Sequence, residues 1–150
     1  MTIEIGFATA ADLPQLAELL SELFTLESDF RPARDRQLRG LRAILDNPAA
    51  GRLFVLRIDG QVAGMANALI TISTAEGGRV LLLEDVIVRR AHRGGGLGRR
   101  LVEHVLAWAG EQGMTRATLL ADRDNAAALE FYRKLGFASS HMTVLRKPVP

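Results

Sequence analysis

The chain has 150 residues, of which 48% are apolar, and it carries a formal net charge of +2. This length and apolar content predict one globular domain over residues 1–150 and exclude a disordered chain. Cysteine is absent, which excludes disulfides, cysteine-ligated zinc and a cysteinyl acyl-enzyme.

The charged residues and the hydropathy limit the partners further. The chain has 17 arginines and two lysines, but the arginines alternate with carboxylates and lack an aromatic stacking platform. We therefore expect no nucleic-acid partner. No apolar stretch is long enough to span a bilayer and no apolar leader follows Met1, so we expect no membrane partner and a cytoplasmic location. The three histidines are scattered, so no metal site is expected.

Apolar periodicity predicts the elements of the N-terminal half in chain order. A capping box at Thr9 and Asp12 and a hairpin signal at Asp59-Gly60 mark two of the boundaries. The expected elements are a strand at 3–7, a helix from Leu13 to Phe24, a connector at 25–34, a helix ending before Asn47-Pro48, and strands at 52–58, 62–73 and 79–89.

The C-terminal half is expected to alternate helices and short strands. A helix runs from Leu97 to about Gly113, a strand covers 116–121, a helix covers 125–135 and ends at Gly136, and a last strand covers 141–146. The order β-α-α-β-β-β-α-β-α-β predicts a mixed α/β sheet with helices on both faces.

A glycine-rich segment, Arg93 to Gly98, separates an apolar run from an amphipathic helix. Glycines at a helix start expose several main-chain N–H groups, which suit a phosphate or pyrophosphate. The segment is neither a P-loop, because Gly98 is followed by Arg99-Arg100, nor a dinucleotide fingerprint, because the third glycine is missing. The spacing that fits is Arg/Gln-x-x-Gly-x-Gly/Ala.

This spacing resembles the acetyl-CoA-binding signature of the GNAT superfamily of N-acyltransferases. The resemblance continues in the central-strand pattern Leu83–Val88, in Asn125–Phe137 and in the opening Thr9–Pro14. It implies a single-domain α/β fold whose mixed, mostly antiparallel sheet splays at the acetyl-CoA site. The chain departs from many relatives at Gly95, where they carry a side chain.

The resemblance also implies how acetyl-CoA binds, with no metal. The free backbone of the central strand would pair with the pantetheine arm, an N–H there would donate to the oxyanion, and the glycine-rich segment would wrap the pyrophosphate. The implied cofactor residues are Val86, Ile87, Val88, Arg93, Gly94, Gly95, Gly96, Leu97, Gly98, Arg99 and Asn125.

Two neighbouring carboxylates, Glu84 and Asp85, interrupt the apolar central strand. Because an unpaired buried charge is unfavourable, at least one of them should meet a cleft or a partner. Pairing with arginine is the structural alternative for each. By the resemblance, Glu84 draws off the proton of the acceptor ammonium, directly or through water.

Asn125 and Tyr132 lie seven residues apart and so share one face of the last helix. Asn125 or Asp124 is also a natural N-cap, and Tyr132 could be an amphipathic core residue. By the resemblance, Tyr132 is the general acid for the departing thiolate. Because a thiol leaves readily, loss of this tyrosine should slow the reaction without abolishing it.

By the resemblance, the acceptor site is bounded by the connector between the first two helices and by the hairpin before the central strand. An exposed loop of mixed charge is the structural alternative for the connector. Phe24, Glu27 and Asp29 are its candidate residues, although Arg31 and Arg34 nearby would favour a carboxylate instead. The resemblance implies direct transfer of acetyl from acetyl-CoA to a primary amine of a small molecule or peptide, without an acyl-enzyme, in a homodimer. The alternative is a CoA-binding module without efficient catalysis.

Overall fold

A computed structural model describes residues 1–27 and 29–150. The chain divides into two compact units, Met1–Leu120 and Ala121–Pro150, and each is described by itself. The first unit contains a five-stranded sheet in the order β1-β2-β3-β4-β5. The strands are β1 (Ile3–Phe7), β2 (Gly51–Ile58), β3 (Gln61–Ser73), β4 (Gly78–Val88) and β5 (Ala117–Leu119).

The sheet is mixed, as predicted. β1 to β4 pair antiparallel in sequence order, and β5 pairs parallel with β4. β2 and β3 join at Asp59-Gly60, where both residues have positive φ, of 49° and 81°. A two-residue turn of this kind matches the twist of the flanking strands, which explains the sharp reversal.

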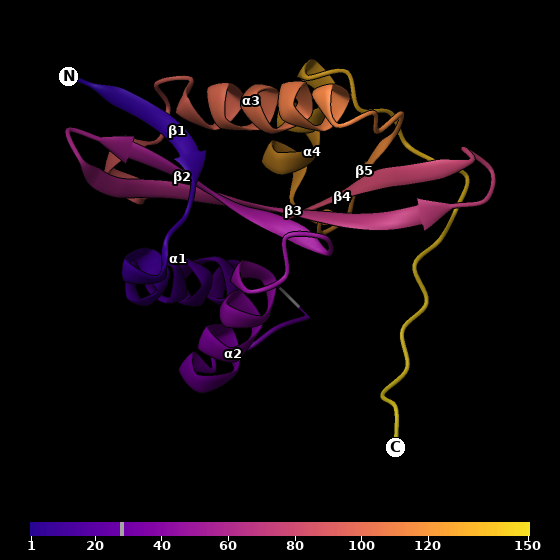
Figure 1. Cartoon of the computed structure of the whole chain (residues 1–150), viewed down its shortest axis with the longest axis horizontal. Coiled ribbons are helices and arrows are strands. Elements are labelled where there is room, and N and C mark those ends of the chain that lie inside the picture. Colours follow the sequence, from indigo (N-terminus) through magenta and orange to yellow (C-terminus); the bar gives the residue numbers. More distant parts are fainter. Residues whose placement is uncertain (28) are drawn as a thin grey trace. The chain divides into compact units, whose positions relative to one another are not determined.

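Helices cover both faces of this sheet (Figure 1). α1 (Leu13–Leu26) and α2 (Arg34–Leu45) lie on one face, and α3 (Leu97–Glu111) lies on the other. β2 illustrates the alternation that divides the core: Leu53 and Val55 belong to the cluster on the α1 side, whereas the Phe54 ring lies 5.3 Å from that of Trp108 on α3.

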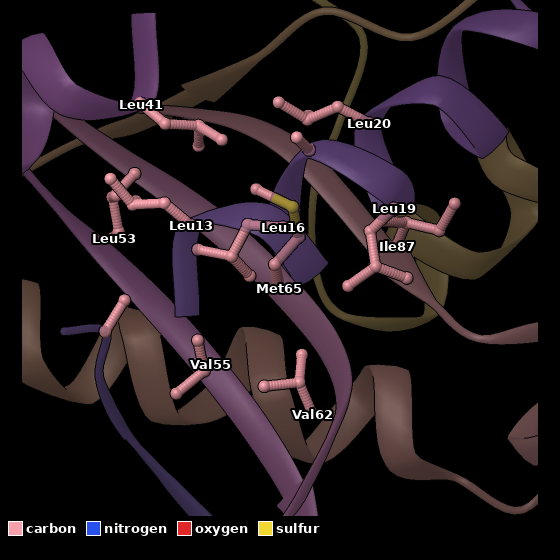
Figure 2. Packing of buried hydrophobic residues seen from close by; sticks show 12 residues of the cluster. Leu13, Leu16, Leu19, Leu20, Leu41, Leu53, Val55, Val62, Met65 and Ile87 are labelled. Atoms are coloured by element: carbon pink, nitrogen blue, oxygen red, sulfur yellow. The ribbon is translucent and has the colours of Figure 1, made fainter. Parts of the chain in front are cut away.

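The core on the α1 side consists of interdigitated aliphatic side chains (Figure 2). Leu16 and Leu19 of α1 and Met65 of β3 are all 0% exposed. They pack with Leu41 of α2 and Ile87 of β4, so this cluster joins both helices to the two central strands. Burial of this apolar surface is the main reason that the α1–α2 pair stays on the sheet.

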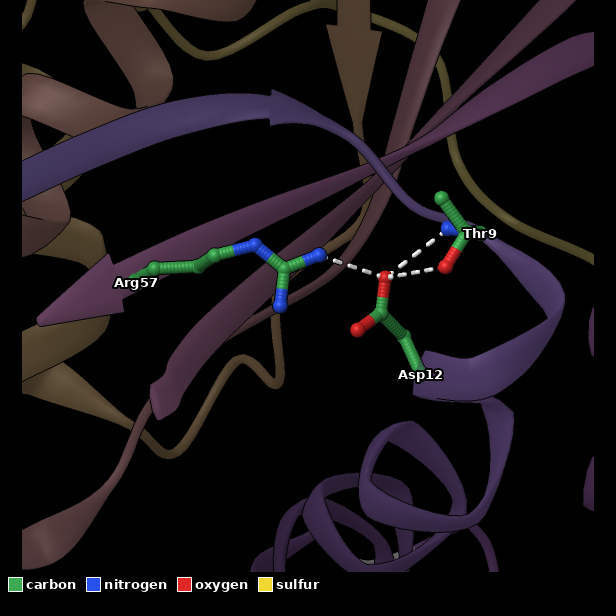
Figure 3. Close-up of polar contacts among 3 residues, drawn as sticks. All are labelled: Thr9, Asp12 and Arg57. Atoms are coloured by element: carbon green, nitrogen blue, oxygen red, sulfur yellow. Dashed lines mark hydrogen bonds and ion pairs between the residues drawn. The ribbon is translucent and has the colours of Figure 1, made fainter. Parts of the chain in front are cut away.

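The predicted capping box is confirmed at the short helix η1 (Ala10–Asp12). The Asp12 Oδ2 atom accepts from the Thr9 N–H at 2.8 Å and from Arg57 Nη2 at 2.7 Å (Figure 3). Asp12 is 5% exposed, and its guanidinium partner comes from β2. The cap therefore also attaches the start of α1 to the sheet.

The second unit contains α4 (Ala126–Lys134), which Asn125 caps by accepting from the Ala128 N–H at 3.0 Å. The predicted last strand at 141–146 is wrong, because no residue of that segment, all of it described, is in a strand. Met142 and Leu145 are 87% and 92% exposed. An alternating apolar pattern alone does not make a strand, because a strand also needs a neighbouring strand with which its main chain can form hydrogen bonds.

Candidate functional site

β4 has a free edge along its second half. β5 pairs only with Leu81, Leu82 and Leu83, so in the described part of the sheet the segment from Glu84 to Val88 has β3 on one side and no strand on the other. This is the predicted splay. The segment includes the predicted backbone groups of Val86, Ile87 and Val88, of which the Val88 carbonyl already accepts a hydrogen bond from Arg93 Nε. An edge with unpaired N–H and C=O groups can take an extended polar ligand as an added strand.

The glycine-rich segment follows this edge and forms the start of α3. Gly94 and Gly96 have positive φ values of 87° and 79°, and Gly96 is the N-cap of the helix. Within the described segment, the N–H groups of residues 94–99 have no main-chain acceptor. The next N–H, that of Arg100, donates to the Gly96 carbonyl at 3.1 Å. A Cβ at Gly94, Gly95 or Gly96 would meet no atom within 4 Å, so the segment is open to a ligand.

The two arginines predicted to bind the cofactor already have partners. Arg93 donates from Nε to the Val88 carbonyl at 2.8 Å and forms an ion pair through Nη2 with Glu22 at 2.5 Å. Arg99 pairs with Glu103 at 2.7 Å. Arg93 thus ties the end of β4 to α1. The groups of this segment best placed for an anion are the main-chain N–H groups at the N-terminus of α3.

The neighbouring carboxylates on β4 differ in their surroundings. Neither pairs with arginine in the described structure; instead, Asp85 Oδ2 accepts from Asn67 Nδ2 at 2.5 Å. Burial, followed by repulsion from Glu84, raises the pKa of Asp85 to about 6, against the lowering effect of the Asn67 bond. Glu84 is half-buried and lies opposite Asn67 in the β3–β4 ladder.

The connector contributes one more carboxylate to this region. Glu27, the C-cap residue of α1, is close enough to Asp85 to add to the increase in its pKa. Phe24 lies 5.4 Å from Phe30, ring to ring, and packs on the core cluster. Asp29 is exposed. Glu27 is thus a predicted acceptor residue whose charge acts on Asp85.

Asn125 and Tyr132 both lie in the second unit. Asn125 is the N-cap of α4, as one of the alternatives predicted. The Tyr132 ring packs edge-on against Phe131 and Phe137, with ring centres 5.0 and 5.8 Å away. Tyr132 is therefore held in an aromatic cluster within its own unit.

A free strand edge followed by a glycine-rich helix start is the arrangement that the sequence resemblance implies. The sequence model of the acetyltransferase (GNAT) family matches residues 13–137. The chain belongs to the GNAT family.

Known GNAT proteins and solved structures agree with this assignment. Streptothricin acetyltransferase of Streptomyces lavendulae is 37% identical over 91 residues, which are 60% of this chain and 46% of that protein. This GNAT chain thus matches less than half the length of that relative. A possible acetyltransferase of Clostridium difficile 630 has the same fold, with a TM-score of 0.90, 19% identity and coverage of 100% and 99% of the two chains.

A structure determined with acetyl-CoA is among the similar folds. This predicted acetyltransferase of Clostridium acetobutylicum superposes with a TM-score of 0.80 at 15% identity, over 97% of the GNAT chain and 96% of its own. Within residues 1–27 and 29–150, no group of three or more His, Asp or Glu side chains could hold a metal ion. The same residues include no helix that is long and apolar enough to cross a membrane.

The sequence analysis of this GNAT chain missed Asn67. The residue is 2% exposed, and its Oδ1 atom has no hydrogen-bond partner among the described residues. A signal was present, because asparagine is depleted in strands and Asn67 interrupts the otherwise apolar run Val62–Ile70. Its partner Asp85 is singled out in the sequence, with arginine as one alternative partner and without asparagine as a candidate.

Proposed function

We propose that this chain transfers an acetyl group from acetyl-CoA to the primary amine of a small molecule or peptide. The observation that carries the proposal is the free edge of β4, which is followed by the short helix η2 (Arg90–His92) and then by the glycine-rich start of α3. The edge suits the amide-containing pantetheine arm and the helix start suits the diphosphate. When bound, acetyl-CoA supplies an activated acetyl thioester.

The chain's own residues would bind and orient the reactants, take a proton from the acceptor and stabilise the leaving sulfur by a hydrogen bond. An alkylammonium with a pKa near 10 must lose a proton before its nitrogen can attack, and Glu84 is proposed to take that proton, directly or through water. Tyr132 is proposed to donate a hydrogen bond to the leaving sulfur. A main-chain N–H in the segment Val86–Val88 is proposed to donate to the carbonyl oxygen of the acetyl group.

A free-thiol assay with acetyl-CoA and a panel of primary amines tests this function. Glu84→Gln should lower kcat by about 10²–10⁴-fold, and Tyr132→Phe by about tenfold, because hydrogen bonding only assists an easily expelled thiolate. Glu111→Gln, at the exposed end of α3, is the matched control and should leave turnover unchanged.

Two outcomes would contradict parts of the proposal. Unchanged turnover in both site variants would remove the roles assigned to Glu84 and Tyr132. Tight acetyl-CoA binding with no amine ever stimulating thiol release would instead favour a CoA-binding module without catalysis.

We further propose that the enzyme forms a homodimer and is located in the cytoplasm. The dimer rests on the family resemblance alone, and the location rests on the sequence alone. Light scattering of the protein as it elutes from a size-exclusion column should give twice the mass of the 16.3 kDa chain. A mass of one chain at all concentrations would contradict the dimer.

A further inference from the structure

Asp85 occupies a strained position in the middle of β4. The β3–β4 register shifts between Met65, which pairs with Ile87, and Asn67, which pairs with Glu84, so β4 has one residue more than β3 at this point. Asp85 is in this bulge with a φ of 54°, in the left-handed region that L-residues rarely adopt. Strained backbone at a strand bulge often positions a functional side chain.

Asn67 holds the carboxylate of this strained residue. Its Nδ2 atom donates to Asp85 Oδ2 at 2.5 Å, while its Oδ1 atom is buried without a partner in the described structure. A buried unsatisfied acceptor is unfavourable, so native proteins keep few of them. Both atoms belong to one planar amide, so this unsatisfied oxygen lies beside the bond to Asp85.

The face on which this pair lies is that of α1 and α2. Asn67 is opposite Leu53 in the β2–β3 ladder, and Leu53 belongs to the core cluster on the α1 side. The ionisable groups that act on Asp85 are Glu84, beside it on β4, and Glu27, at the end of α1. Both are carboxylates, so the local charge around Asp85 is negative.

We propose that Asp85 binds the acceptor amine as its ammonium ion, and that Asn67 is the positioning residue that holds the Asp85 carboxylate for it. This rests on the proposed function and names the charged form in which the acceptor is recognised. Glu84 next to it remains the group proposed to take the proton.

A primary ammonium fits these observations better than other ligands. It carries the charge that three nearby carboxylates favour, and its N–H groups can donate to a carboxylate oxygen. A metal ion fits less well, because these carboxylates do not form a metal-binding group within the described chain. An anionic acceptor group would be repelled by Glu27, Glu84 and Asp85.

Carbon-13 NMR titration of the Asp85 carboxyl in the protein saturated with CoA tests the binding directly. Ethylammonium chloride should lower the pKa of Asp85 by about one pH unit, because a bound cation favours the ionised form. Tetramethylammonium chloride at the same ionic strength is the control, since it has the charge but no N–H donor, and it should leave the pKa within a few tenths. An equal response to both salts, or to neither, would overturn the proposal.

Kinetics with the best amine of the panel provide the second readout. Asp85→Asn keeps a residue that tolerates positive φ, and it should raise the KM for the amine about tenfold or more while kcat changes less than threefold. Asp59→Asn is the matched control, with the same substitution at the other aspartate of positive φ. A fall in kcat with an unchanged KM would contradict ammonium binding at Asp85.

Asn67→Leu tests the positioning role, because the leucine side chain branches at Cγ as asparagine does but has no hydrogen-bond donor. If Asp85 must be ionised to bind the amine, the acidic limb of kcat/KM includes its ionisation and should move to higher pH by about one unit, because the Asn67 bond that lowers the pKa of Asp85 is lost. A purely structural role would lower activity without moving that limb. Failure of acetyl transfer with every amine would contradict the proposed function alone, because the NMR titration is independent of turnover.

Discussion

At the scale of single residues, two aspartates show how surroundings set the behaviour of a carboxylate. Burial raises the pKa of Asp12, but hydrogen bonds from Arg57 and Thr9 outweigh it, so that the pKa is lowered. Among the described residues, Asp85 has the Asn67 amide as its one side-chain donor, and burial beside other carboxylates leaves its pKa raised. The first arrangement stabilises the ionised carboxylate and the fold, whereas the second disfavours the ionised form of Asp85.

Asp12→Asn should lower the free energy of unfolding by about 2 kcal/mol at pH 7, because it removes the charge from a buried ion pair. Since the folded pKa is depressed, this contribution is present above the unfolded value of 3.8 and should be lost as the pH falls through the folded pKa. Urea unfolding at several pH values measures it. Asp46→Asn, in an exposed pair at 3.9 Å, is the control and should change stability by less than about 0.5 kcal/mol.

Asp85→Asn should have the opposite effect on stability. Because the folded pKa of about 6 exceeds the unfolded value of 3.8, the ionised carboxylate destabilises the fold, and the wild type should lose stability as the pH rises from 3.8 to 6. The variant should therefore be more stable at pH 8 by up to about 2–3 kcal/mol and equal below pH 4. Equal pH profiles of wild type and variant would contradict this assignment.

At the scale of elements, most helices and strands followed from local signals. The capping box, the Asp59-Gly60 turn and the start of α3 at Leu97 act over a few residues, and the structure confirms them. The bulge at Asp85 and its bond to Asn67 join residues 18 positions apart through strand register. No local pattern encodes that register, so this part of the site could not be predicted from the sequence.

The attachment of α1 to the sheet depends on its buried face. Leu16→Ala should lower the free energy of unfolding by about 2–5 kcal/mol, because Leu16 is 0% exposed between α1 and the central strands. Leu26→Ala in the same helix, at 62% exposure, should change it by less than about 0.5 kcal/mol. Denaturant unfolding of both variants measures the difference, and similar values for the two would contradict this packing.

At the scale of the molecule, the sheet separates two tasks. Its free β4 edge and the start of α3 are proposed to bind acetyl-CoA, and its α1 face carries the carboxylates proposed to receive the amine. The sequence predicted the first part, because glycine spacing is local. For the amine site, the sequence predicted Glu84 and Glu27 as separate residues but not Asn67. The Asn67 amide comes from β3, and strand register brings it to Asp85.

Calorimetric titration of acetyl-CoA into two glycine variants tests the central claim, that main-chain N–H groups at the start of α3 bind the diphosphate. Gly96 and Gly113 flank α3 with φ values of 79° and 81°, so alanine at either should strain the backbone equally. Gly96→Ala should weaken acetyl-CoA binding about tenfold or more, and Gly113→Ala should leave it unchanged. Equal affinities of the wild type and Gly96→Ala would contradict the claim.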